Sequence, residues 1–147
     1  MPLEDAPGYD LERFVRAQDA GGSYGRAVEE LRRGRKESHW IWYVFPQVAG
    51  LGRSDISRRY AISSLGEARA YLRHRVLGPR LRECAGIVVA VEGSSAAEIF
   101  GPLDAQKFRS CMTLFHRAAP SEALFRLALE RYFDGDPDPA TDRFLAR

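Results

Sequence analysis

Hydrophobic residues recur along most of the chain at the spacing of one helix face. Between residues 24 and 31, Tyr24, Ala27, Val28 and Leu31 occupy positions i, i+3, i+4 and i+7. This repeat is typical of an amphipathic α-helix. The same period is found over residues 11–18, 65–92, 108–115 and 124–133. The pattern predicts an all-α fold in which each surface helix buries one face.

Capping residues mark where these helices begin and end. Ser64 with Glu67, and Ser95 with Glu98, have the spacing of a capping box. Pro139 suits the first position of a last short helix. Other N-caps are predicted at Asp10, Ser23, Ser121 and Asp138, and glycine stops at Gly21, Gly22, Gly34 and Gly93.

The run Ile87 to Val91 is the one segment with strand-like composition. Periodicity alone cannot separate a buried strand from a buried helix in so short a run. Because it continues a helical stripe and has no matching partner strand, we predict that it is helical. No linker or repeat divides the chain, so we expect one domain over residues 1–147, with residues 1–9 and 146–147 frayed.

Six consecutive positions, Trp40 to Phe45, hold both tryptophans and four aromatic residues in all. Neither helical nor alternating spacing gives these aromatics one face, so the segment must be nearly surrounded by protein. One interpretation is a central core helix, capped by Ser38 and ended by Pro46. The other is a pocket partly lined by aromatics, Trp40 included, with His39 and Gln47 as its polar groups.

Two more segments could bind a ligand. Gly50, Gly52 and Ser54 precede a short helix, and two glycines let backbone N–H groups converge on an anion; the alternative interpretation is a tight turn into that helix. On the helix that follows Gly101, Asp104 and Lys107 share one face, and Thr113 lies further along. Such a pair is ordinarily solvated, but beside a ligand it could position or protonate it.

Composition limits the function classes. The chain has 147 residues, 45% of them hydrophobic and 29% charged, as in ordinary globular proteins. The net charge of +2 is too small to indicate nucleic-acid or membrane binding. Lys36 and Lys107 are the two lysines among 22 basic residues, which makes Lys107 conspicuous.

The chain shows no targeting signal and no metal motif. Acidic residues stand where a signal peptide needs positive charge, so we expect a cytoplasmic protein. Cys84 and Cys111 are then reduced core thiols, and neither has the spacing of a zinc site. The segment Asp134 to Asp138 fails the calcium-loop pattern and is predicted to be a turn. We expect no metal and no cofactor.

Short motifs along nearly the whole chain resemble those of the domain-of-unknown-function 1810 family of small bacterial proteins. The resemblance implies a mainly helical single domain and no established activity. Arg75 and Cys111 depart from the family pattern, which usually has Pro and Ser at those positions. Some members are labelled calpastatin, a disordered inhibitor, and the core-forming periodicity seen here argues against that transfer. The motifs are Asp10-Leu11-x-Arg13-Phe14, Ser38-His39-Trp40-x-Trp42, Phe45-Pro46-Gln47, Gly50-Leu51-Gly52-x-Ser54, Asp104-x-x-Lys107 and Met112-Thr113-Leu114-Phe115.

Two hypotheses follow from the residues. In the first, a small anionic ligand, of which a nucleotide is one example, binds where the three candidate segments meet. His39, Lys107 and Asp104 are then the candidate catalytic groups, while Trp40, Gln47, Gly50, Gly52, Ser54 and Thr113 bind the ligand. In the second, the protein is a non-enzymatic helical module whose basic surface at Arg32, Arg33, Arg35 and Lys36 meets an acidic partner. The sequence leaves open whether the protein is an enzyme and what its oligomeric state is.

Overall fold

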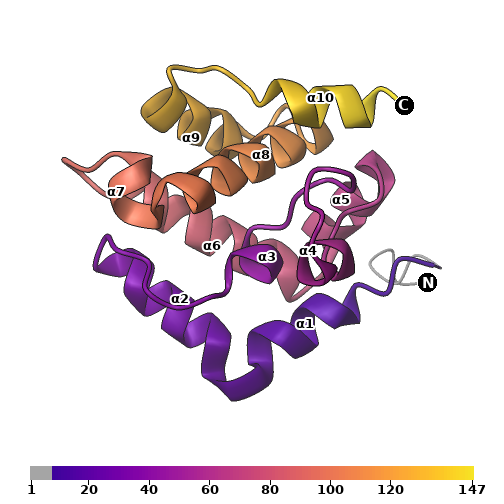
Figure 1. Cartoon of the computed structure of the whole chain (residues 1–147), viewed down its shortest axis with the longest axis horizontal. Helices are drawn as coiled ribbons and strands as arrows, with labels where there is room; N and C mark the ends of the chain where they lie inside the picture. The colour runs from indigo at the N-terminus through magenta and orange to yellow at the C-terminus, as the bar shows by residue number, and fades with distance from the viewer. Residues whose placement is uncertain (1–7) are drawn as a thin grey trace.

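Two long helices, α6 (Leu77–Ala90) and α8 (Pro102–Ala118), form the middle of the molecule (Figure 1). Helix α6 packs against α2 (Ser23–Arg32), α5 (Leu65–Arg73) and α9 (Ala123–Phe133). Helix α8 packs against α5, α9, α7 (Ala96–Phe100) and α10 (Pro139–Leu145). The structure is a computed structural model and describes residues 8–147. The predicted all-α fold is confirmed.

The N-terminal helices form the opposite edge of the molecule from α9 and α10 (Figure 1). Helix α1 (Glu12–Asp19) joins α2 through a 3-10 turn at Ala20–Gly22, in which Gly21 has a φ of +61°. The short helices α3 (Ile41–Val44) and α4 (Asp55–Arg59) follow. An isolated parallel bridge between Val48 and Ile62 ties together the chain on either side of α4. Apart from that bridge, residues 8–147 hold no β-structure.

The helix predicted over residues 65–92 is divided in two. Helix α5 ends at Arg73, and His74 is both its C-cap and the start of the turn into α6. The Nδ1 atom of His74 accepts hydrogen bonds from the backbone N–H groups of Val76 and Leu77, at 3.1 and 3.3 Å. A side chain that binds the next free N–H groups competes with helix continuation, so the periodicity runs on while the helix does not.

The aromatic segment forms only one helical turn. Helix α3 covers Ile41–Val44, and Ser38 does not cap it. The Ser38 backbone N–H and hydroxyl instead donate to the carboxylate of Glu30, at 2.9 and 2.6 Å. This carboxylate also accepts from the indole N–H of Trp40 at 2.9 Å. The predicted core helix is therefore wrong in length, because Glu30 holds the residues before α3 in a loop.

Some of the other predicted N-caps form in the structure, and others do not. The capping box of Ser95 and Glu98 is complete, and Asp138 caps α10 with Pro139 at its first position. Ser64 caps α5, but Glu67 turns its carboxylate to Ser63 instead of completing the box. Helices α1, α2 and α9 have no side-chain cap, so the predictions at Asp10, Ser23 and Ser121 are wrong. The Ser23 hydroxyl pairs with the Tyr43 hydroxyl at 2.6 Å instead.

The core is rich in aromatic rings. Trp40 and Phe45 are fully buried, whereas Trp42 and Tyr43 are half-buried. The Phe45 ring meets the Phe108 ring edge-on at 4.9 Å, and Phe108 stacks on Phe100 at 4.7 Å. The aromatic segment is thus central to the packing, as its composition predicted, even though most of it is not helical.

Two further predictions concern the end of α6 and the two cysteines. The segment Ile87–Ala90 completes α6, and Val91 is its C-cap. Cys84 and Cys111 are buried free thiols, and burial raises the pKa of Cys84 to about 12.

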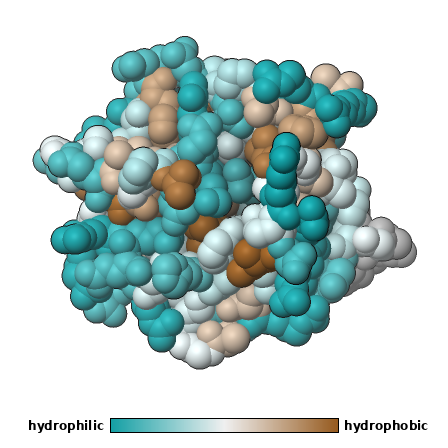
Figure 2. All heavy atoms as spheres, viewed as in Figure 1, coloured by the Kyte–Doolittle hydropathy of each residue, from teal (hydrophilic) through white to brown (hydrophobic). Residues whose placement is uncertain are grey.

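Figure 2 shows one face of the molecule, which is mostly hydrophilic with separate apolar areas. No described helix combines the length and the apolar composition that a bilayer crossing requires. The predicted fraying of residues 1–9 falls mainly outside the described residues.

Candidate functional site

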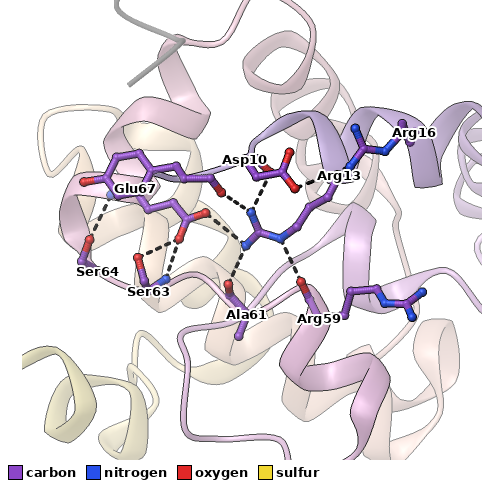
Figure 3. A network of polar contacts seen from close by, with 9 residues as sticks. Asp10, Arg13, Arg16, Arg59, Ala61, Ser63, Ser64 and Glu67 are labelled. Carbon is purple, nitrogen blue, oxygen red and sulfur yellow. Dashed lines mark hydrogen bonds and ion pairs between the residues drawn. The ribbon is translucent and has the colours of Figure 1, made fainter. Parts of the chain in front are cut away.

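One guanidinium group joins three separate segments of the chain (Figure 3). Arg13 lies in the first turn of α1, and five oxygen-bearing groups surround its side chain. One of them is the carboxylate of Glu67 in α5, which forms an ion pair with Arg13 at 3.1 Å. The others are the main-chain carbonyl groups of Tyr9, Asp10, Arg59 and Ala61, at 2.5, 2.8, 2.8 and 2.8 Å respectively.

Glu67 completes this arrangement from the α5 side. Its side chain is 2% exposed, and its Oε1 atom accepts from the Ser63 backbone N–H at 2.7 Å and hydroxyl at 2.8 Å. A buried carboxylate needs a charged partner to offset its desolvation, and Arg13 supplies it. Arg13 is therefore fully engaged in holding α1, the end of α4 and the start of α5 together.

An open cleft of about 510 Å³ lies beside this group. Its two rim arginines, Arg16 and Arg59, extend on the same side of Arg13 (Figure 3). Arg16 is 67% exposed, and its Nη2 atom lies 3.5 Å from the Asp10 carboxylate. The exposed side chain of Arg59 has no acceptor within residues 8–147. The cleft is lined by Asp10, Arg13, Arg16, Ala17, Ala20, Arg59 and Tyr60.

The lining of the cleft combines positive charge with an apolar floor. Ala17, Ala20 and the ring of Tyr60 form the apolar part, and this ring is fixed from behind by Phe14 at 5.8 Å and Tyr43 at 5.4 Å between centroids. Guanidinium groups bind carboxylates and phosphates with paired hydrogen bonds. A cleft of this volume is within the range of small-molecule sites. The arrangement fits an anion attached to a flat or apolar group.

A second hollow of about 210 Å³ lies between the end of α8 and α9. His116 lines it, and its Nδ1 atom is buried with no partner among the described residues. Desolvation and the nearby Arg117 and Arg126 lower the pKa of His116. Arg117 is paired with Asp142 at 2.9 Å and Arg126 with Glu130 at 2.7 Å. The charges of both arginines are thus already balanced, whereas Arg59 at the larger cleft has no acidic partner among residues 8–147.

The structure brings three of the predicted site residues together. The Asp104 carboxylate lies 3.2 Å from Lys107 and 2.9 Å from Lys36. The Lys36 ammonium lies 5.1 Å from the centroid of the Trp40 ring and donates to the Ser38 carbonyl at 2.5 Å. Both lysines of the chain therefore converge on one aspartate. Trp40 is fully buried and Lys36 is 6% exposed, so this cluster lies largely inside the protein.

The remaining predicted residues lie apart from this cluster. His39 is exposed before α3, and no hydrogen bond joins its side chain to another residue in the described part of the chain. The Gln47 carbonyl accepts from the Ile62 N–H at 2.8 Å, which positions the bridge. Thr113 is fully buried: its hydroxyl donates to the Arg109 carbonyl and accepts from the Asp138 N–H, both at 2.9 Å.

Neighbouring side chains fill the space beside both glycines of the predicted anion turn. At Gly50, with a φ of +105°, a Cβ atom would lie 2.5 Å from the ring of Phe144 in α10. At Gly52 it would lie 2.3 Å from the Ser57 Cβ. Ser54 caps α4 by accepting from the Ser57 N–H at 3.2 Å. Catalytic and ligand-binding roles for the sequence-selected residues stay predictions.

The basic surface in the second hypothesis is partly neutralised by acids of the same chain. Arg33 lies 3.3 Å from Glu29 and 3.8 Å from Glu37. Arg32 lies 3.8 Å from Glu83. With Lys36 buried against Asp104, Arg35 is the member with no partner among residues 8–147.

Sequence reasoning missed Arg16 and Arg59, and gave Arg13 no role. In an arginine-rich chain a single arginine carries little information. A local signal exists at Arg13 and Arg16, because their i, i+3 spacing places both on one face of α1. No signal in the sequence joins them to Arg59, 43 positions after Arg16, since that contact depends on how α4 packs beside α1.

No curated protein sequence matches the chain. A family model described as "Protein of unknown function (DUF1810)" matches residues 8–145. A crystal structure of the conserved hypothetical protein Rv1873 from Mycobacterium tuberculosis is similar throughout. The two chains are 52% identical with a TM-score of 0.91, and the match covers 95% of this chain and 98% of that one.

Proposed function

The chain belongs to the DUF1810 family of proteins of unknown function, and from that premise we propose that it binds a small anionic, nucleotide-like ligand in the cleft between α1 and α4. The ligand's anionic group lies between Arg16 and Arg59, and its flat part lies against Ala17, Ala20 and Tyr60. The ligand class is the one predicted from the sequence. The proposed binding site, however, consists of residues that the sequence did not single out.

The proposal rests on the difference in hydrogen bonding and ion pairing among the three arginines of the cleft. Arg13 donates to four carbonyl groups, pairs with Glu67, and forms the wall of the cleft. Arg59 has no side-chain acceptor in residues 8–147, and the contact of Arg16 with Asp10 is a long one on the surface. Exposed ion pairs of this kind contribute little to stability. Two guanidinium groups are therefore available to an anion at little cost to the fold.

Thermal denaturation with adenosine 5′-monophosphate tests the proposal. Binding to the native state alone raises stability by about 2.7 kcal/mol at a hundredfold excess over the dissociation constant. We expect the nucleotide to raise the melting temperature of the unaltered protein, and Arg16→Ala and Arg59→Ala each to abolish most of that rise. Both side chains are exposed, so the melting temperature without ligand should change little.

Arg143→Ala is the matched control, because it removes an exposed arginine of α10 outside the cleft. This variant should respond to the nucleotide as the unaltered protein does. The proposal is wrong if the nucleotide does not stabilise the unaltered protein, or if Arg143→Ala loses the response to the same extent as Arg16→Ala and Arg59→Ala.

A further inference from the structure

Asp10 brings a negative charge to the proposed anion site. It has a φ of +48°, a left-handed conformation that few residues other than glycine, asparagine and aspartate adopt. Its carbonyl group accepts from the Arg13 side chain at 2.8 Å and from the Arg13 backbone N–H at 3.3 Å. The most fully engaged residue of the site therefore fixes the backbone of Asp10.

This fixed backbone places the Asp10 carboxylate in the lining of the cleft. Its Oδ2 atom lies 3.5 Å from Arg16 Nη2, and the side chain is 62% exposed. Asp10 does not cap α1, although its position before that helix suits a cap. The carboxylate is thus directed to the arginine that we propose binds the ligand.

A carboxylate in this position acts differently on two kinds of anion. It repels any anion that approaches Arg16, and it is only an acceptor of hydrogen bonds. An anion that carries hydroxyl groups can donate to it and offset the repulsion. An anion without a donor cannot, and selectivity arises from a penalty of this kind as much as from attraction.

We propose that Asp10 makes the cleft select phosphate esters that carry hydroxyl groups, such as sugar phosphates and nucleotides, over phosphate esters that carry none. The inference rests on the proposed function, since it concerns the same cleft. The phosphate group lies between Arg16 and Arg59, and the hydroxyl groups donate to Asp10. Tyr60 and the two alanines remain for the apolar part.

Calorimetric titration with ribose 5-phosphate and ethyl phosphate tests this selectivity. The two probes have the same ester group and differ in their hydroxyl groups. We expect the unaltered protein to bind ribose 5-phosphate roughly tenfold more tightly, the value of one added hydrogen bond. In Asp10→Asn, ethyl phosphate should bind roughly fivefold more tightly, because the repulsion is removed, and most of the preference should be lost.

Asp134→Asn is a closely matched control. Among residues 8–147, Asp134 is the other non-glycine residue with a positive φ, at +54°, and it is exposed at the end of α9. Asparagine tolerates this conformation, so both variants should fold and both change the net charge equally. Asp134→Asn should keep the tenfold preference.

The outcomes separate this inference from the proposed function. If both probes bind equally to the unaltered protein and Arg16→Ala abolishes binding of both, the anion site stands and the role of Asp10 is overturned. An unchanged preference in Asp10→Asn, or an equal loss in Asp134→Asn, also overturns it. If neither probe binds the unaltered protein, this inference is overturned, whereas the proposed function is overturned only if adenosine 5′-monophosphate also fails to stabilise the protein.

Discussion

At the scale of single residues, Arg13 and Arg16 are one helical turn apart and should behave in opposite ways. Arg13→Met keeps much of the side-chain volume but leaves Glu67, 2% exposed, as a buried charge without its partner. Breaking such a pair costs about 3 to 5 kcal/mol. Arg16→Met removes only an exposed pair and should cost less than about 0.5 kcal/mol. Urea unfolding of the two variants measures both values, and equal losses would contradict the assigned role of Arg13.

Glu30 gives the protein a specific pH dependence. Burial favours its neutral form, but hydrogen bonds from Ser38, Glu37 and Trp40 outweigh this and lower its pKa from 4.5 to about 2. A carboxyl group with a lowered native pKa stabilises the fold above its unfolded pKa, and this stabilisation is lost as the pH falls from about 4.5 toward 2.

Glu30→Gln removes this dependence. By linkage, we expect the variant to lose about 3 kcal/mol at pH 7 and about 1 kcal/mol at pH 3, relative to the unaltered protein. Unfolding by urea at the two pH values gives both differences. Glu29→Gln is the control, because the Glu29 side chain is 70% exposed on the same helix. A loss that is the same at both pH values would show that the charge of Glu30 is not responsible.

At the scale of helices, two glycines of α6 differ in their surroundings: Gly78 packs closely against α5, and Gly86 has free space beside it. A Cβ atom on Gly78 would lie 2.2 Å from the Leu72 carbonyl oxygen of α5. On Gly86 it would meet nothing within 4 Å. Gly78→Ala should therefore destabilise the protein by about 1 to 3 kcal/mol through overpacking, whereas Gly86→Ala should stabilise it by about 0.5 to 1 kcal/mol.

Thermal unfolding of both variants tests whether α6 crosses α5 at Gly78. If Gly78→Ala were as stable as Gly86→Ala, the two helices could not approach as closely as the structure shows.

The helices also show what sequence can and cannot predict. Local signals succeeded: apolar periodicity identified the helical class, and the capping box at Ser95 depends only on residues within one turn. Predictions failed where a side chain took over the backbone hydrogen bonds that the predicted helix would have made. Glu30 binds the backbone before α3, and His74 ends a helix whose apolar stripe continues unbroken. Neither interaction can be found from periodicity, because each depends on the packed structure.

At the scale of the whole molecule, the same limit applies to the candidate site. Lys107 was selected because lysine is rare in this chain, and the structure does place it beside Asp104. The second lysine, Lys36, meets the same aspartate from a different part of the chain. The proposed cleft depends on a contact between α1 and α4, and no spacing within the sequence reports such a contact.

The convergence of both lysines on Asp104 makes the protein resistant to a particular protease. An enzyme that cuts only after lysine has two cleavage sites in this chain, one in the loop where the Lys36 side chain is 6% exposed and one within α8. Cleavage needs an extended segment, so it must wait for this part of the fold to open. We expect digestion by a lysine-specific protease, followed by mass spectrometry, to follow the free energy of unfolding as urea is added. An arginine-specific protease should instead cut the native protein at its exposed arginines.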